Sequence, residues 1–172
     1  YNTILIEESV KAENPGFGHS VQNDLVVPYL LRHSTEEQKK RWLPKICTGE
    51  TIGALAMTEP GGGSDVAAIK TLAKDMGDHF LVNGSKSFIT NGLLADLVIV
   101  ACKTDSKAGA HGISLIILER GMEGFDTPEM HGKHSLRASS TGELIFNNVR
   151  VPKENVLPNK DGLGAPLSCL DS

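Results

Sequence analysis

The fold class of this chain rests on one stretch of sequence, which reads His79-Phe80-Leu81-Val82-Asn83-Gly84-Ser85-Lys86-Ser87-Phe88-Ile89-Thr90-Asn91-Gly92. It contains two short runs of apolar and β-branched residues, and an Asn-Gly pair follows each run. A tight type I′ turn needs a positive φ at both central residues, and Asn-Gly accepts that conformation readily. The stretch therefore predicts two antiparallel strands joined by a hairpin at Asn83-Gly84, with a second turn at Asn91-Gly92.

Similar short runs continue on both sides of this stretch, and Gly, Asn, Asp and Pro separate them. Regularly spaced short strands with turn residues between them are typical of an antiparallel barrel or sandwich. Pro152 is expected to end the sheet because proline cannot donate a hydrogen bond to a neighbouring strand. The further predicted strands cover residues 51–58, 97–100, 112–118, 143–146 and 149–151.

The first fifty residues follow a helical period instead, with apolar residues three and four positions apart. Residues 15–18, Pro-Gly-Phe-Gly, should interrupt this region between two helices. A third helix is expected after Ser34 or Thr35, because each has Glu or Gln three positions later, as in a capping box. Gly49 should end it, with Trp42 facing the core.

The predicted fold class is α+β. N-terminal helices, the end of an α domain, occupy residues 1–50, and an antiparallel β-barrel or sandwich domain occupies residues 51–158. Residues 159–172 are expected to form a loop and the first residues of a C-terminal helical bundle.

Composition excludes several classes of protein. The 172 residues include 17 Lys+Arg and 21 Asp+Glu, a net charge of −4, so no basic surface indicates nucleic-acid binding. No apolar run approaches the roughly 20 residues of a membrane span, and the acidic first residues do not resemble a signal peptide. The three distant cysteines fit neither a disulfide framework nor a Cys-x-x-Cys metal site, and they favour a reducing compartment. The chain begins at Tyr1 rather than Met, so we expect a fragment of a longer protein.

One segment could bind a phosphate. Residues 56–68 read Ala-Met-Thr-Glu-Pro-Gly-Gly-Gly-Ser-Asp-Val-Ala-Ala and follow a predicted strand. Three successive glycines allow unusual backbone angles, and their N–H groups can converge on an anion, while Thr58 and Ser64 add hydroxyl groups. No Gly-Lys-Ser/Thr follows and no βαβ unit surrounds the segment, so it is neither a P-loop nor a dinucleotide fingerprint. A plain surface turn is the structural alternative.

These motifs together resemble the acyl-CoA dehydrogenase family. Residues 56–68 look like its flavin-binding signature, and residues 88–92, Phe-Ile-Thr-Asn-Gly, look like its second motif at the customary distance. Residues 34–43 resemble a helix of the family, and residues 149–152 resemble the exit from its middle β domain. The resemblance covers essentially the whole chain.

The resemblance implies FAD as cofactor and an acyl-CoA thioester as substrate. Thr58 would bond the edge of the flavin ring, Gly63 and Ser64 would lie at the pyrophosphate, and Thr90 would bond near flavin N5. Phe88 takes the place of the Trp of most members, as in the long-chain members. The cofactor contacts carried over are Leu55, Ala56, Met57, Thr58, Gly63, Ser64, Phe88, Ile89 and Thr90, and the substrate contacts are Ser64, Ala110, His111 and Ser139.

The implied reaction is α,β-dehydrogenation of an acyl-CoA to the trans-2-enoyl-CoA. A Glu removes the α-proton as general base, and the β-hydrogen leaves as hydride to FAD. In the family that Glu belongs to the C-terminal helical bundle, so no catalytic residue is expected in this chain. Glu59 is interpreted as structural rather than as a substitute base, because its position in the motif lies beside the cofactor.

The acyl group is less defined. Residues 16–18, 110–114 and 121–125 look like long-chain dehydrogenases, whereas residues 132–142 and 163–170 look like glutaryl-CoA dehydrogenases. The glutaryl enzymes hold the distal carboxylate with an Arg ahead of a Ser-Val-Gln segment. Residues 20–22 are Ser-Val-Gln here, but residues 13–19 contain no Arg or Lys. An unpaired buried carboxylate is unfavourable, so we predict a medium-to-long acyl chain, with glutaryl-CoA as the alternative.

Two other classes remain open: a non-catalytic flavin- or CoA-binding fragment, and a flavin monooxygenase on the same scaffold. By resemblance, electron-transfer flavoprotein is the expected oxidant and the full-length protein is a homo-oligomer, a tetramer or dimer. The expected location is the bacterial cytoplasm or the mitochondrial matrix. His131 and His134 are three residues apart, but an apparent loop separates them and no third ligand is evident, so no metal site is predicted.

Overall fold

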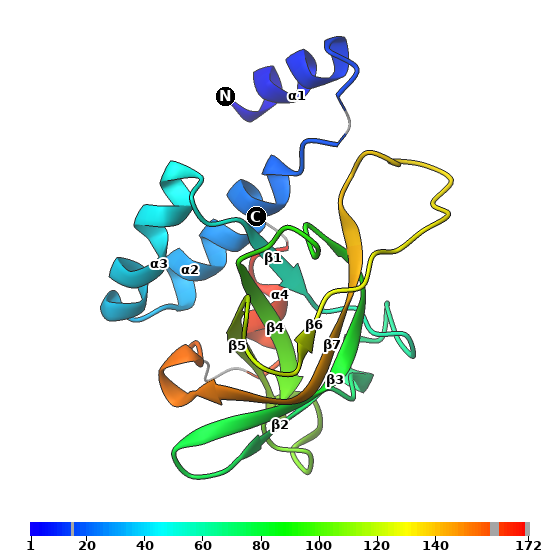
Figure 1. Cartoon of the computed structure of the whole chain (residues 1–172). Helices are drawn as coiled ribbons and strands as arrows, with labels where there is room; N and C mark the ends of the chain where they lie inside the picture. The colour runs from blue at the N-terminus through cyan, green and yellow to red at the C-terminus, as the bar shows by residue number, and fades with distance from the viewer. Residues whose placement is uncertain (15, 159–161, 171–172) are drawn as a thin grey trace.

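The computed structural model describes residues 1–14, 16–158 and 162–170. N-terminal helices lead into a curled sheet that forms about half of a barrel, which confirms the α+β fold class (Figure 1). Among the described residues the sheet has seven strands, in the order β1-β4-β2-β3-β7-β6, with β5 paired to β4. The strands are β1 (Gly53–Ala56), β2 (Leu72–Asp75), β3 (His79–Thr90), β4 (Leu97–Lys103), β5 (Ile113–Glu119), β6 (Phe125–Asp126) and β7 (Thr141–Pro152).

The predicted helices are present. Helix α1 (Asn2–Lys11) has no buried residue and projects from the body of the molecule (Figure 1). The π-helix η1 (Val21–Val26) continues directly into α2 (Val27–His33), and α3 (Glu36–Thr48) follows. Helix α3 begins with a capping box formed by Thr35 and Gln38 and ends at Gly49, whose φ is 78°. Trp42 is buried against the core, as expected.

The sheet is mixed rather than purely antiparallel. β3 pairs antiparallel with β2 and β7, and β4 pairs antiparallel with β5. β1 and β2, however, both pair parallel to β4, at residues 97–100 and at Lys103 respectively. The chain returns from β1 to β4 through the β2–β3 hairpin, so the parallel pairing needs no βαβ unit.

The predicted hairpin at Asn83-Gly84 is wrong. Both residues lie inside the single strand β3, at a bulge where its register with β7 shifts. The turn lies earlier, between β2 and β3, where Gly77 has a φ of 99° and Met76 N–H donates to the His79 carbonyl. β7 is likewise one strand rather than two, and β2 and β6 were not predicted. The second predicted turn, at Asn91-Gly92, is confirmed.

Two apolar clusters hold these elements together. Alternate residues of β4 face opposite sides, with Val98 and Val100 packed inside the curled sheet and Leu97 and Ile99 packed against the helices. Because both faces of β4 and β5 are covered, their sequences are continuously apolar. The helical side of the second cluster contains Val26, Tyr29, Leu30, Trp42 and Ile46.

Short helices complete the chain. η2 (Val66–Ala68), η3 (Gly109–Gly112) and η4 (Lys153–Asn155) are 3-10 turns, and α4 is Gly164–Leu167. Helix α4 contacts α2, where the Tyr29 hydroxyl donates a hydrogen bond to the Pro166 carbonyl. The loop predicted from residue 159 lies partly outside the described residues, since 159–161 are not among them. In the part of the chain that the structure describes, no helix has the length and apolarity needed to span a membrane.

Candidate flavin and acyl-CoA site

The glycine-rich segment forms a closed loop between β1 and β2. Glu59 N–H donates to the Gly62 carbonyl at 3.0 Å and Gly62 N–H donates back to the Glu59 carbonyl at 3.1 Å. This tight turn places Gly61 and Gly63 on the surface, with Ser64 next to them. The loop then runs through η2 into β2.

The three glycines do not adopt the unusual backbone angles that the sequence suggested. None of Gly61, Gly62 and Gly63 has a left-handed φ. A Cβ built on Gly61 meets nothing within 4 Å, and those on Gly62 and Gly63 make only ordinary contacts at 3.5 Å and 3.7 Å. The described chain therefore gives no internal reason for glycine here, whereas close approach of a ligand to the backbone would require it.

The same loop carries donors without partners. Among the described residues, no acceptor contacts the N–H groups of Gly61, Gly63 or Ser64. The hydroxyls of Thr58, Ser64 and Thr90 also lack a hydrogen-bond partner within residues 1–14, 16–158 and 162–170. Successive exposed N–H groups next to a hydroxyl form an anion-binding surface.

The Glu59 side chain is buried and hydrogen-bonded within the protein. Its carboxylate accepts from Lys70 N–H at 2.7 Å, from Thr71 N–H at 3.0 Å and from Lys86 Nζ at 2.9 Å. Burial raises the pKa of Glu59, but these hydrogen bonds outweigh burial and hold the pKa below its ordinary value. These contacts support the interpretation of Glu59 as a structural residue, which stays a prediction.

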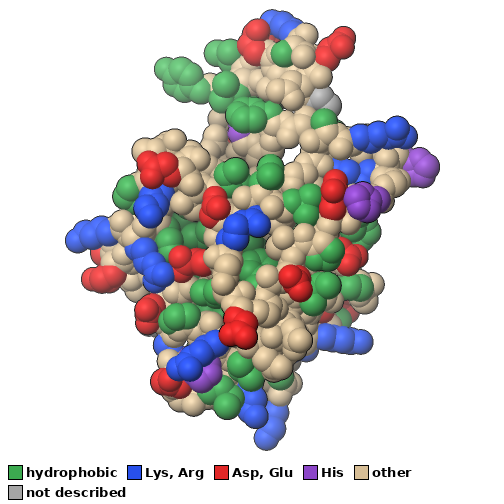
Figure 2. Space-filling view, viewed as in Figure 1, with side chains coloured by type: hydrophobic (Ala, Val, Ile, Leu, Met, Phe, Trp, Pro, Cys, Tyr) green, Lys and Arg blue, Asp and Glu red, His purple; other side chains and the backbone are tan. Residues whose placement is uncertain are grey.

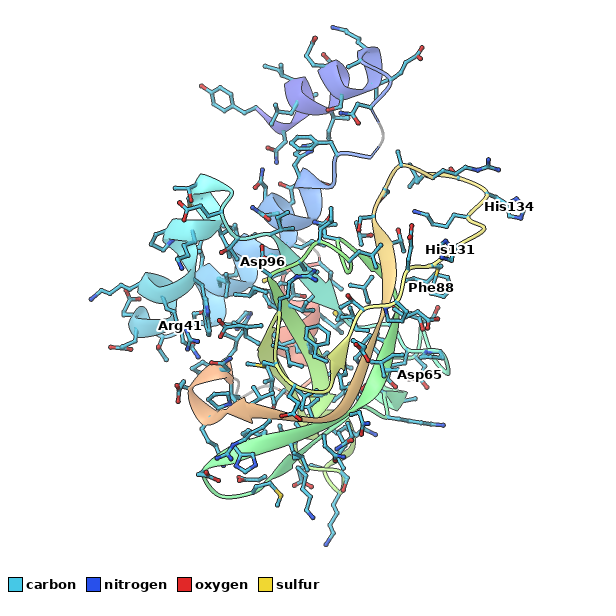
Figure 3. All side chains as sticks on the ribbon, viewed as in Figure 1. Arg41, Asp65, Phe88, Asp96, His131 and His134 are labelled. Atoms are coloured by element: carbon cyan, nitrogen blue, oxygen red, sulfur yellow. The ribbon has the colours of Figure 1, made fainter. Side chains whose placement is uncertain are left out.

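The second motif lies against the first. Ser87 N–H donates to the Thr58 carbonyl at 2.9 Å, which joins β3 to the segment that follows β1. The register between β3 and β7 shifts between Lys86 and Ile89, and Phe88 occupies this bulge with a φ of 61°. Phe88 is 66% exposed, although it is a large apolar residue. In the view of Figure 3 it lies between Asp65, on the glycine-rich loop, and His131.

Some predicted cofactor contacts can act only through the backbone. The side chains of Ala56 and Ile89 are buried in the cluster inside the sheet. Those of Leu55 and Met57 pack against the cluster on the helical side. Thr58, Ser64, Phe88 and Thr90 are therefore the side chains open to a ligand.

The predicted substrate contacts lie at two other places. Ala110 and His111 belong to η3, which packs against η2 just beyond the glycine-rich loop. Ser139 is in the long loop before β7, and its neighbour Ser140 accepts from Asn91 N–H at 2.8 Å. This contact places Ser139 near the end of β3, where Thr90 pairs with Thr141.

Sequence reasoning assigned no role in assembling the site to the side chains of Lys86 and Asn91. Lys86 is fully buried, and its ammonium group pairs with Glu59 of the glycine-rich loop. Asn91 donates from its side chain to the carbonyls of Gly18 and Gly53, at 3.2 Å and 3.3 Å, and so joins the N-terminal helical region to β1 and β3. The sequence did indicate that Lys86 is buried, because it lies an even number of residues after Phe80 and Val82, on the same inward-facing side of β3.

The loop before β7 carries a group of basic side chains, visible on the projecting loop in Figure 2. Lys133 is engaged within the loop, since its Nζ donates to the carbonyls of Leu136 and Ser139 and to the Thr141 hydroxyl. His131 and His134 are exposed. Among the described residues, no three His, Cys, Asp or Glu side chains gather to hold a metal ion.

Comparison with protein families identifies the family of this chain. The model of the acyl-CoA dehydrogenase middle domain matches residues 54–149, and that of the acyl-CoA dehydrogenase N-terminal domain matches residues 1–50. The chain belongs to the acyl-CoA dehydrogenase family.

Individual acyl-CoA dehydrogenases support this assignment. The mitochondrial long-chain specific acyl-CoA dehydrogenase of Sus scrofa is 44% identical over 90% of this chain and 36% of its own length. A crystal structure of an acyl-CoA dehydrogenase from Geobacillus kaustophilus is 48% identical, with a TM-score of 0.84, over 87% of this chain and 40% of that one. A glutaryl-CoA dehydrogenase from Mycobacterium smegmatis in complex with FADH2 is 42% identical, with a TM-score of 0.85, over 94% and 41%. The chain thus spans about two fifths of the length of these relatives.

The site of this acyl-CoA dehydrogenase chain fits a flavin nucleotide. The unpaired N–H groups of Gly63 and Ser64 and the open space beside Gly61 suit a diphosphate that approaches the backbone closely. The exposed Phe88 ring offers an apolar surface to an aromatic ring system, and the Thr58 and Thr90 hydroxyls can bond its polar edge. The arrangement can therefore bind and orient such a cofactor.

Proposed function

We propose that this chain forms the flavin-binding wall of an FAD-dependent acyl-CoA dehydrogenase, which converts an acyl-CoA thioester to its trans-2-enoyl-CoA. The observation that carries the proposal is the junction of two motifs. The hydrogen bond from Ser87 to Thr58 brings unpaired donors and an exposed aromatic ring to one edge of the sheet. Residues 1–50, 51–158 and 159–172 would be the end of one helical domain, the middle β domain and the start of a second helical domain.

Each open side chain has a proposed role. Gly63 and Ser64 hold the pyrophosphate, Thr58 and Thr90 bond the flavin ring, and Phe88 packs against it. Leu55, Ala56, Met57 and Ile89 contribute through the backbone. FAD, when bound, supplies the acceptor for the β-hydrogen of the substrate. Ser64, Ala110, His111 and Ser139 would contact the acyl-CoA, and the general base would belong to a helical segment outside this chain.

For the acyl group we propose a medium-to-long chain. A Cβ on Gly16 would lie 2.7 Å from the carbonyl oxygen of Ala138, so a long cationic side chain cannot replace Gly16 without moving that loop. The described residues of 13–19 contain no Lys or Arg that could pair with a distal carboxylate. The likeness to a glutaryl-CoA dehydrogenase makes glutaryl-CoA the second candidate.

The proposed partners follow from the family. Electron-transfer flavoprotein would reoxidise the cofactor, and the full-length protein would assemble as a dimer or tetramer. Its proposed location is the bacterial cytoplasm or the mitochondrial matrix.

Anaerobic titration of the purified full-length protein tests the proposal. We expect bound flavin whose visible absorbance is bleached by palmitoyl-CoA or octanoyl-CoA, and much less by glutaryl-CoA. A protein that binds FAD but is bleached by no acyl-CoA would instead be a flavin-binding protein or a monooxygenase. A protein that does not bind FAD would overturn the proposal, and bleaching by glutaryl-CoA alone would overturn the substrate assignment.

A further inference from the structure

Lys86 is a buried cation inside the curled sheet. Its side chain is 0% exposed and lies in the apolar interior of the curled sheet, where β3 pairs with Leu144 of β7. Transfer of an ammonium group out of water is unfavourable, and buried ion pairs are often no more stabilising than apolar residues of similar volume. A conformational role is therefore a better explanation of this residue than a contribution to stability.

Among the described residues, the side-chain hydrogen bonds of Lys86 go to the segment after β1. Its Nζ donates to the Met57 carbonyl and to Glu59 Oε1, both at 2.9 Å. Together with the Ser87–Thr58 hydrogen bond, these contacts join residues 57–59 to residues 86–87 at three points. The first and second motifs are thus held at a fixed separation.

Glu59 extends this connection to the far end of the glycine-rich loop. Its carboxylate also accepts from the N–H groups of Lys70 and Thr71, at 2.7 Å and 3.0 Å. One side chain therefore closes the loop from residue 59 to residue 71 at its base. Its third donor, Lys86, comes from β3.

Lys86 also immediately precedes the bulge that exposes Phe88. The β3–β7 register is regular at Lys86 and shifts before Ile89. Any displacement of Lys86 would therefore move the glycine-rich loop relative to Phe88 and Thr90.

We propose that the Lys86–Glu59 ion pair is the positioning element that holds the glycine-rich loop against the Phe88–Thr90 segment in the arrangement that binds the flavin nucleotide. This inference rests on the proposed function. Both side chains are buried, so they would act on the cofactor through the backbone that they hold.

The test compares FAD affinity with stability in the full-length protein. Lys86→Met removes the cation with little change in volume, and Glu59→Gln removes the anion. The double variant Lys86→Met/Glu59→Gln leaves no unpaired buried charge but lacks the two Lys86 hydrogen bonds, so only the Ser87–Thr58 hydrogen bond still joins β3 to this segment. Lys153→Met is the matched control, because Lys153 forms a partly exposed pair with Asp75 outside the loop.

FAD is removed, and its rebinding is followed by flavin fluorescence, while thermal unfolding of the apo proteins is measured separately. We expect each single variant to bind FAD at least tenfold more weakly and Lys153→Met to bind it as the wild type does. The double variant should recover thermal stability relative to Lys86→Met without recovering FAD affinity. If Lys86→Met does not fold, the double variant and Glu59→Gln carry the test.

Two results would overturn the inference alone: wild-type FAD affinity in the single variants, or joint recovery of affinity and stability in the double variant. A wild-type protein that binds no FAD would instead overturn the proposed function together with the inference.

Discussion

Replacement of Gly61 or Gly63 by Ala tests whether glycine is needed there for the fold or for binding of the flavin nucleotide. Neither glycine has a left-handed φ, and a Cβ at Gly61 meets nothing within 4 Å while one at Gly63 meets only Thr58 Cγ2 at 3.7 Å. Alanine is therefore compatible with the backbone at both positions. Such a substitution stabilises a protein by about 0.4–1 kcal/mol, because it restricts the unfolded chain.

Flavin binding should respond in the opposite direction. A methyl group on this surface keeps a phosphate away from the N–H groups of Gly63 and Ser64, which have no acceptor among the described residues. A hydrogen bond to a charged group contributes about 1.5–3 kcal/mol. Loss of one such bond corresponds to roughly tenfold to a hundredfold weaker binding of FAD.

The assay measures the FAD dissociation constant and the thermal unfolding midpoint of the apo form of the full-length protein. Gly124→Ala is the control, because its Cβ would lie 2.1 Å from the Asn147 carbonyl oxygen and its φ is 81°. That variant should lose stability, with unchanged FAD affinity in its folded fraction. Wild-type FAD affinity in both Gly61→Ala and Gly63→Ala would refute the assignment of these glycines to the cofactor.

Other substitutions test the fold and its electrostatics in the full-length protein. Gly84→Ala should destabilise it by about 1–3 kcal/mol in urea unfolding, since φ is 144° and Thr71 lies 2.6 Å from the added Cβ; an unchanged midpoint would contradict this. Thr35→Ala removes the side chain that caps α3 and should cost about 1 kcal/mol, whereas Thr35→Ser should cost much less. The pKa of Glu59 in the folded protein lies below its ordinary value of 4.5. The contribution of Glu59 to stability is therefore present above pH 4.5 and is lost as the pH falls through its pKa in the folded protein. Thermal unfolding measured across that range should depend less on acid in Glu59→Gln than in the wild type.

The helices could be predicted because their signals are local. The capping box of Thr35 and Gln38 and the glycine after α3 determine the ends of that helix within a few residues of sequence. The continuous apolar runs of β4 and β5 were also recognisable, because both faces of these strands are buried. β2 was not predicted because only Ala73 of its four residues is buried, which leaves no apolar pattern to recognise.

The prediction of a hairpin at Asn83-Gly84 was wrong because contacts with residues distant in the sequence determine the conformation of both residues. The Asn83 side chain exchanges hydrogen bonds with Asn148, on β7, 65 residues later. Gly84 is needed where Thr71 approaches the backbone of β3, and its φ of 144° belongs to a bulge rather than a turn. A dipeptide preference cannot distinguish these two uses of the same pair of residues.

The candidate site shows the same division. Its two motifs could be recognised by resemblance. Which of their glycines serve a ligand could not, because that depends on whether neighbouring residues in the fold already require glycine at each position. Gly84 and Gly124 are explained by neighbours within the chain, since a Cβ at either position would meet other residues at under 3 Å. Gly61 and Gly63 have no such neighbours, and Phe88 exposes two thirds of a large apolar side chain from a strained bulge. The packing of the chain itself does not explain these residues, which lie at one edge of the sheet, and they are the structural observations that support the proposed flavin site.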